Sequence, residues 1–120
     1  MTRPSTRDRP QLRSVHQTLA DAFPGLNWQL HTSADGHPVR AVYQPSARFW
    51  IRIQPDTSTR HVRVECRICT EVYDGAESWP CRDDREMLEA VNRFLDKQSQ
   101  CFRFQNEEDH MIEKGGSEYA

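Results

Sequence analysis

Two stretches of the chain, residues 47–54 and 61–73, alternate apolar and polar side chains with a period of two. Successive side chains of a β-strand point to opposite faces, so each stretch predicts a strand with one buried and one displayed face. The apolar side chains of both stretches must cover a core. The displayed face carries one tryptophan and several arginines: Arg48, Trp50, Arg52, Arg63 and Arg67.

Two further strands are expected before these, over residues 26–32 and 39–44. A hairpin turn at Asp35-Gly36 would join them, since Asp-Gly supplies the positive φ angles that tight hairpins need. In this arrangement Arg40 joins the arginines of the displayed face. The core side of the second strand is expected to carry Val39, Ala41 and Tyr43. Short connections between consecutive strands predict a simple antiparallel meander.

A helix is expected over residues 9–23, where apolar residues recur at helical spacing. Its apolar stripe consists of Leu12, Val15, Leu19, Ala22 and Phe23. Asp8 is a suitable N-cap, and Pro24-Gly25 is a suitable stop signal.

A second helix is expected to begin after Asp83, an N-cap whose capping box Glu86 would complete. This helix is expected to end near residues 99–101. Residues 74–81, which lie before it and contain Gly75 and a Trp-Pro pair, are expected to form a loop.

The expected fold is therefore of the α+β class, a single domain with the order α-β-β-β-β-α. Two helices would cover one face of an antiparallel four-stranded meander and leave the other face open to water or to a partner. Residues 1–8 are expected to be disordered, residues 9–104 to form the domain and residues 105–120 to form a flexible acidic tail.

Charge is distributed unevenly along the 120 residues, whose total is −2. Residues 37–70 hold six arginines against two acidic residues, a net of +4. Residues 71–120 hold six basic and thirteen acidic residues, a net of −7. A dedicated nucleic-acid binder is usually basic as a whole, so this composition argues against that class while leaving room for a local basic patch.

Four cysteines raise the question of a zinc site. Cys66, Cys69 and Cys81 are weak candidates for metal ligands, because Cys66 and Cys69 would point to opposite faces of a continuous strand. Thiols with a packing or surface role are the favoured interpretation, and no metal or other cofactor is expected.

Motifs of catalysis are absent from the sequence. It contains no Gly-rich phosphate loop, no nucleophile elbow and no HExxH motif, so we expect no enzyme. The first residues have no apolar segment like that of a secretory signal, and no apolar run approaches the length of a membrane span. We therefore expect no membrane association, a cytoplasmic location and reduced thiols.

The leading hypothesis is a non-catalytic protein-interaction module, such as a small regulator, inhibitor, adaptor or immunity-type protein. It would dock through the displayed face onto a protein with an acidic patch, because Trp and Arg are enriched at binding hot spots. The expected contact residues are Trp50 as the anchor with Arg40, Arg48, Arg52, Arg63 and Arg67.

Three alternatives stay open. The same face could bind single-stranded nucleic acid or a nucleoprotein, with Trp50 stacking on a base. The chain could form a homodimer through this face or through an edge strand. The simplest alternative is an ordinary solvated face in which arginine stems shield Trp50 and arginine–carboxylate pairs add a little stability.

Overall fold

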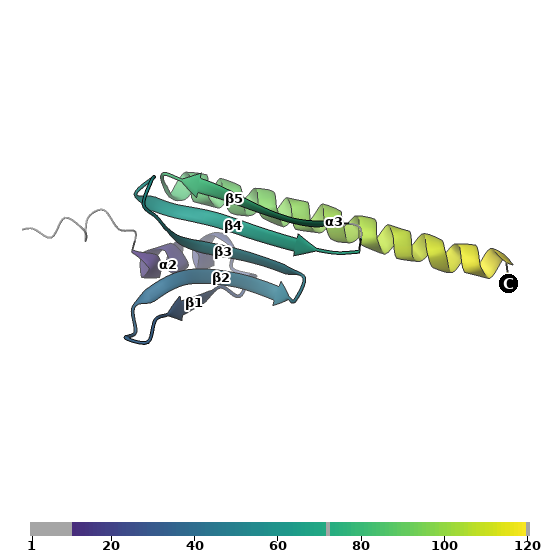
Figure 1. Ribbon diagram of the computed structural model, residues 1–120, viewed down its shortest axis with the longest axis horizontal. Helices are drawn as coiled ribbons and strands as arrows, with labels where there is room; N and C mark the ends of the chain where they lie inside the picture. Colours follow the sequence, from purple (N-terminus) through teal and green to yellow (C-terminus); the bar gives the residue numbers. More distant parts are fainter. Residues whose placement is uncertain (1–10, 72, 120) are drawn as a thin grey trace, which may run out of the picture.

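The computed structural model describes residues 11–71 and 73–119, with side-chain surroundings for residues 11–71 and 73–102. These described residues form one antiparallel sheet with the strand order β1-β2-β3-β4-β5, together with two helices (Figure 1). The elements are α2 (Leu12–Ala22), β1 (Gln29–Thr32), β2 (Pro38–Ser46), β3 (Phe49–Asp56), β4 (His61–Cys69), β5 (Asp74–Cys81) and α3 (Asp84–Tyr119). The predicted α+β class and the antiparallel meander are confirmed.

The sheet has five strands rather than the expected four. Residues 74–81, expected to be a loop, form β5, which pairs with β4 from Asp74 opposite Cys69 to Cys81 opposite Val62. β5 buries only Cys81 and contains both Gly75 and Pro80, so it lacks the apolar alternation that reveals a strand. An edge strand tolerates this composition because one side of its backbone faces no neighbour.

The alternation in β3 and β4 produces a buried row of apolar side chains in each strand, as predicted. Phe49, Ile51 and Ile53 are fully buried, while Trp50 and Arg52 between them are only partly buried. In β4 the buried row consists of Val62, Val64, Cys66 and Ile68. Each large apolar side chain that is fully removed from water contributes about 1.5–3 kcal/mol to folding.

The expected phase of β2 is correct at Ala41 and Tyr43, whereas Val39, expected on the same side, is 38% exposed. Ala41 pairs with Ile53 and Tyr43 pairs with Ile51, so both residues lie on the core side. Val42 lies on the opposite side yet is only 6% exposed. The hairpin between β1 and β2 turns at Gly36, whose φ of 86° lies in the left-handed region that favours glycine.

α2 is shorter than expected at its start. It begins at Leu12 with Gln11 as N-cap, and the Gln11 side chain makes no capping hydrogen bond. The expected N-cap, Asp8, lies outside the described residues. Leu12, Val15 and Leu19 are buried as expected, whereas Ala22 at the last turn is exposed.

α3 begins as expected and ends much later. The Glu86 backbone N–H donates to Asp83 Oδ1 at 2.9 Å, as expected for an N-cap. The Glu86 carboxylate accepts at 2.7 Å from the backbone N–H of Arg82, whereas the expected capping box would use the N–H of Asp83. The expected end near residues 99–101 is wrong, because the helix continues to Tyr119. Residues 105–119 of the expected tail therefore lie in α3, and the flexibility of this segment stays a prediction.

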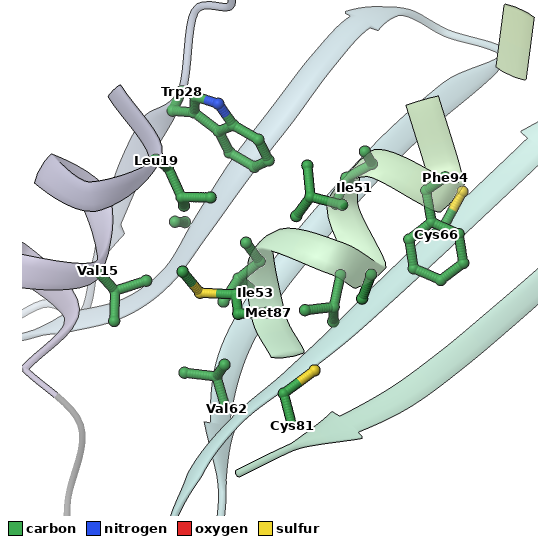
Figure 2. Close-up of a cluster of buried hydrophobic side chains, with 14 of the residues drawn as sticks. Val15, Leu19, Trp28, Ile51, Ile53, Val62, Cys66, Cys81, Met87 and Phe94 are labelled. Atoms are coloured by element: carbon green, nitrogen blue, oxygen red, sulfur yellow. The ribbon is translucent and has the colours of Figure 1, made fainter. Parts of the chain in front are cut away.

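Both helices pack on the same face of the sheet, and the core lies between them and the strands. Figure 2 shows Val15 and Leu19 of α2 on the same side of the core as Met87 of α3 and Ile53, while Phe94 of α3 lies farther along the core beside Cys66. Within residues 11–71 and 73–119, no helix lies on the other face of the sheet, as the sequence predicts. No helix in the described part of the chain is long and apolar enough to span a membrane.

Candidate functional site: the open face of the sheet

The open face is the face of the sheet that α2 and α3 do not cover. Strand register places alternate residues of all five strands on it: Gln29, His31, Arg40, Val42, Trp50, Arg52, Gln54, Arg63, Glu65, Arg67, Ala76 and Ser78. Its middle is aromatic and cationic. Five of the six predicted contact residues are therefore on one surface, and the sixth, Arg48, lies in the turn between β2 and β3.

Trp50 and Arg52 form a stacked pair at the centre of this face. The Arg52 guanidinium carbon lies 3.9 Å from the centroid of the Trp50 ring. A cation over an indole ring contributes about 0.5–1 kcal/mol at an exposed site. Arg52 is also the cross-strand neighbour of Val42, which is nearly buried although no helix covers it. The open-face side chains thus shield one another, in part as the solvated-face alternative expects.

Arg63 and Arg67 are already engaged by acidic groups of the same chain. Arg63 Nε lies 3.1 Å from Asp56 Oδ1, and its Nη1 donates to Ser78 Oγ at 2.9 Å. Arg67 Nη2 lies 3.1 Å from Asp74 Oδ1. Both arginines hold neighbouring segments of the sheet together, and their charge is locally balanced.

Arg40 and Arg48 have no such partner. Within the described part of the chain, neither guanidinium makes a hydrogen bond or an ion pair, and Arg52 makes none besides its stacking on Trp50. Arg48 is exposed, while Arg40, Trp50 and Arg52 are partly exposed. We call these four residues the β2–β3 patch. The arginines on the β4–β5 side of the open face therefore make ion pairs with carboxylates of the same chain, whereas those on the β2–β3 side make none in the described part of the chain, although Glu65 is the cross-strand neighbour of Arg52.

The three cysteines considered as weak metal ligands do not converge. Cys66 is buried on the core side of β4 and Cys69 lies on the open face, as the strand geometry predicts. Cys81 pairs with Val62, at the other end of β4 from Cys69. Burial raises the pKa of the Cys66 thiol to about 12 and that of Cys81 to about 11. Among the described residues, no three His, Cys, Asp or Glu side chains are grouped closely enough to hold a metal ion.

The histidine contacts offer no nucleophile–base pair within residues 11–71 and 73–102. His61 Nε2 lies 2.8 Å from Asp84 Oδ1, and His16 Nε2 lies 2.8 Å from the backbone oxygen of Trp28. His37 lies near Asp35. None of these imidazoles contacts a serine hydroxyl or a cysteine thiol, the arrangement that nucleophilic catalysis needs.

A second aromatic–cationic cluster lies on the helix side, where sequence reasoning placed nothing. Arg93 of α3 lies over the Trp79 ring with a centroid distance of 4.9 Å, and Lys97 lies at the same distance over Tyr73. Lys97 Nζ also donates to Glu77 Oε1 at 2.8 Å. Its hydrogen bonds to Glu77 and then Tyr73 raise the pKa of Lys97 above its usual range. The cluster attaches edge strand β5 to α3. The sequence did not predict this cluster, because residues 74–81 lack the apolar alternation of a strand.

In comparisons with protein-family models, curated proteins and solved structures, no significant match to this chain is found.

Proposed function

We propose that the chain is a non-catalytic protein-interaction module whose β2–β3 patch docks onto an acidic surface of a partner protein. One observation carries the proposal. Within the described part of the chain, Arg40 and Arg52 on the open face and Arg48 in the adjoining turn make no ion pair with a carboxylate, although Arg63 and Arg67 on the open face each make one. A partner's carboxylates would complete the pairing.

The stacked pair suits an interface. The Arg52 guanidinium carbon lies 3.9 Å from the centroid of the Trp50 ring, and its N–H groups make no hydrogen bond within the described part of the chain. The edge of a guanidinium can bind both oxygens of one carboxylate, a geometry that gives specificity as well as attraction. The arginine is also partly ordered before binding, so less side-chain entropy is lost when a partner arrives.

The nucleic-acid alternative is less well supported. Base stacking needs an open aromatic face, and Arg52 lies 3.9 Å over the ring of Trp50. The net charge of −2 also works against attraction to a phosphate backbone. We therefore prefer an acidic protein surface as the partner.

The test is an affinity capture from nuclease-treated lysate of the source cells. The protein is compared with a variant carrying Arg48→Glu and Arg52→Glu and with Arg13→Glu as a matched control, since Arg13 is an exposed arginine on α2. Circular dichroism first establishes that all three proteins are folded. We expect a partner retained by the wild type and the control and lost by the double variant, because its new carboxylates repel an acidic surface.

Capture of the same proteins by the wild type and the double variant would contradict the proposal. A partner retained from untreated lysate but absent after capture from nuclease-treated lysate would instead favour the nucleic-acid alternative.

A further inference from the structure

We propose that the β2–β3 patch receives the acidic C-terminal part of α3 from a second copy of this chain, so that the protein self-associates through reciprocal contacts. The inference rests on the proposed function, because it names the acidic partner of that same patch. It depends on charge, on the position of α3 and on the face that the patch occupies.

The charges are complementary. Residues 104–119 of α3 contain Glu107, Glu108, Asp109, Glu113 and Glu118 against a single basic residue, Lys114, a net of −4. The patch contributes three arginines without acidic partners in the described part of the chain. Docking of one open face onto another would bring like charges together and is disfavoured. The acidic segment is therefore the complementary surface that a second copy offers.

The C-terminal part of α3 would also be stabilised by a partner. Cys101 of α3 is buried against the core. Beyond it the helix projects past the end of the sheet, away from α2 and the strands (Figure 1). Most helical stability in proteins comes from packing of one face against other elements, so a segment that projects from the domain would be stabilised by docking onto a partner.

The segment cannot reach the patch of its own chain. α3 packs on the core face of the sheet, whereas the patch lies on the open face. Because α3 runs as one helix to Tyr119, its last residues continue away from the domain (Figure 1). In Figure 1 the arrowhead of β2 lies at the end of the sheet beyond which α3 projects, so Arg48 in the following turn lies at that end too. Two copies that meet there can each offer a helix to the other's patch, and this reciprocity closes the assembly as a dimer.

A charge-exchange experiment tests the inference by sedimentation velocity over a range of protein concentrations. The patch variant carries Arg48→Glu and Arg52→Glu, and the helix variant carries Glu107→Lys, Glu108→Lys and Asp109→Lys. Lysine is as good a helix former as glutamate and a better one than aspartate, so the helix variant keeps its secondary structure. Arg13→Glu is the control.

We expect the wild type and the control to dimerise. Each variant alone should associate at least about tenfold more weakly, since both patch–helix contacts of its dimer become repulsive. Mixing the two variants restores association, because the acidic patch of one meets the lysines of the other while both native surfaces also meet. Circular dichroism of each variant shows that it is folded.

A wild type that stays monomeric at every concentration would overturn the inference. So would a dimer that neither variant weakens, or a mixture that fails to associate. The proposed function is judged separately: if capture of a foreign partner needs Arg48 and Arg52 but tolerates the helix variant, the patch is an interface and its occupant is not a second copy.

Discussion

Asp56 is the most heavily hydrogen-bonded carboxylate described in the structure, and it links the β3–β4 turn to Arg63. It accepts hydrogen bonds from the Ser58 hydroxyl at 2.6 Å and from both the backbone and the hydroxyl of Thr59 at 3.1 and 2.9 Å. These bonds, from Ser58 first, then Thr59 and Arg63, lower the pKa of Asp56 from 3.8 to about 2. The folded state therefore favours the ionised carboxylate.

A pH-dependent contribution to stability follows. Because the folded pKa is depressed, the stabilisation by Asp56 is fully present above the unfolded value of 3.8 and is lost as pH falls through about 2. We expect Asp56→Asn to lower the free energy of unfolding at neutral pH, with the difference from wild type shrinking across this acid range. Urea unfolding at several pH values measures it. Asp96→Asn, at an exposed position on α3, serves as the control. A difference that stays constant from neutral to acid pH would contradict the assignment.

The sequence predicts which face of the sheet the arginines of β3 and β4 occupy, but not which of them form ion pairs. Alternation correctly predicts that Arg52, Arg63 and Arg67 share the open face with Trp50. It does not show which of them are already paired, since Asp56 and Asp74 become their partners only through strand register and turn geometry. The narrowing of the candidate site to the β2–β3 patch therefore required the structure.

At the scale of elements, the strands with a buried row are the ones that the sequence identifies. β4 buries every second residue and β3 does so as far as Ile53, and this period is visible without a structure. β5 has no such period, because it is an edge strand held by Lys97 and by its backbone pairing with β4. The end of α3 was missed for a related reason, since residues 104–119 are polar and have no apolar stripe.

The attachment of β5 to α3 gives an element-scale prediction. Lys97 contacts both Glu77 within β5 and Tyr73 just before it, so Lys97→Ala should loosen this edge of the sheet. The Lys97–Glu77 pair is partly exposed, so we expect a loss of global stability of no more than about 1 kcal/mol. Hydrogen exchange should become faster at the amides of residues 74–81 and stay unchanged in β2 and β3.

The matched control for this prediction is Arg85→Ala, which removes a cation from an exposed position near the start of α3. Uniformly faster exchange over the whole sheet in the Lys97→Ala variant would argue against a local role. Unchanged exchange in β5 would show that backbone pairing with β4 is sufficient to hold the edge.

At the scale of the whole molecule, the four thiols report on opening of the fold. Cys66, Cys81 and Cys101 are buried, and burial holds the pKa of Cys66 and Cys81 near 12 and 11, whereas Cys69 is partly exposed on the open face. Since the thiolate is the reactive form, we expect one thiol to react rapidly with a disulfide reagent in the native protein. The other three should react only at the rate at which the molecule unfolds.

Cys69→Ser should remove the rapid phase and leave the slow phase unchanged, as measured by absorbance during labelling. The slow phase should accelerate with urea, in step with loss of the circular dichroism signal. Rapid labelling of two or more thiols in the native wild type would contradict the packing of the core.

The arrangement of both helices on one face also affects how the protein is made on the ribosome. All five strands precede α3 in the chain, so the nascent chain can complete its hairpins while half of their apolar face is still bare. That face is covered only when residues such as Met87 and Phe94 have been synthesised. Translation adds about 5–20 residues per second, so this interval lasts on the order of seconds. The nascent chain is then most exposed to chaperones and to aggregation, and translational pausing before α3 would lengthen that exposure.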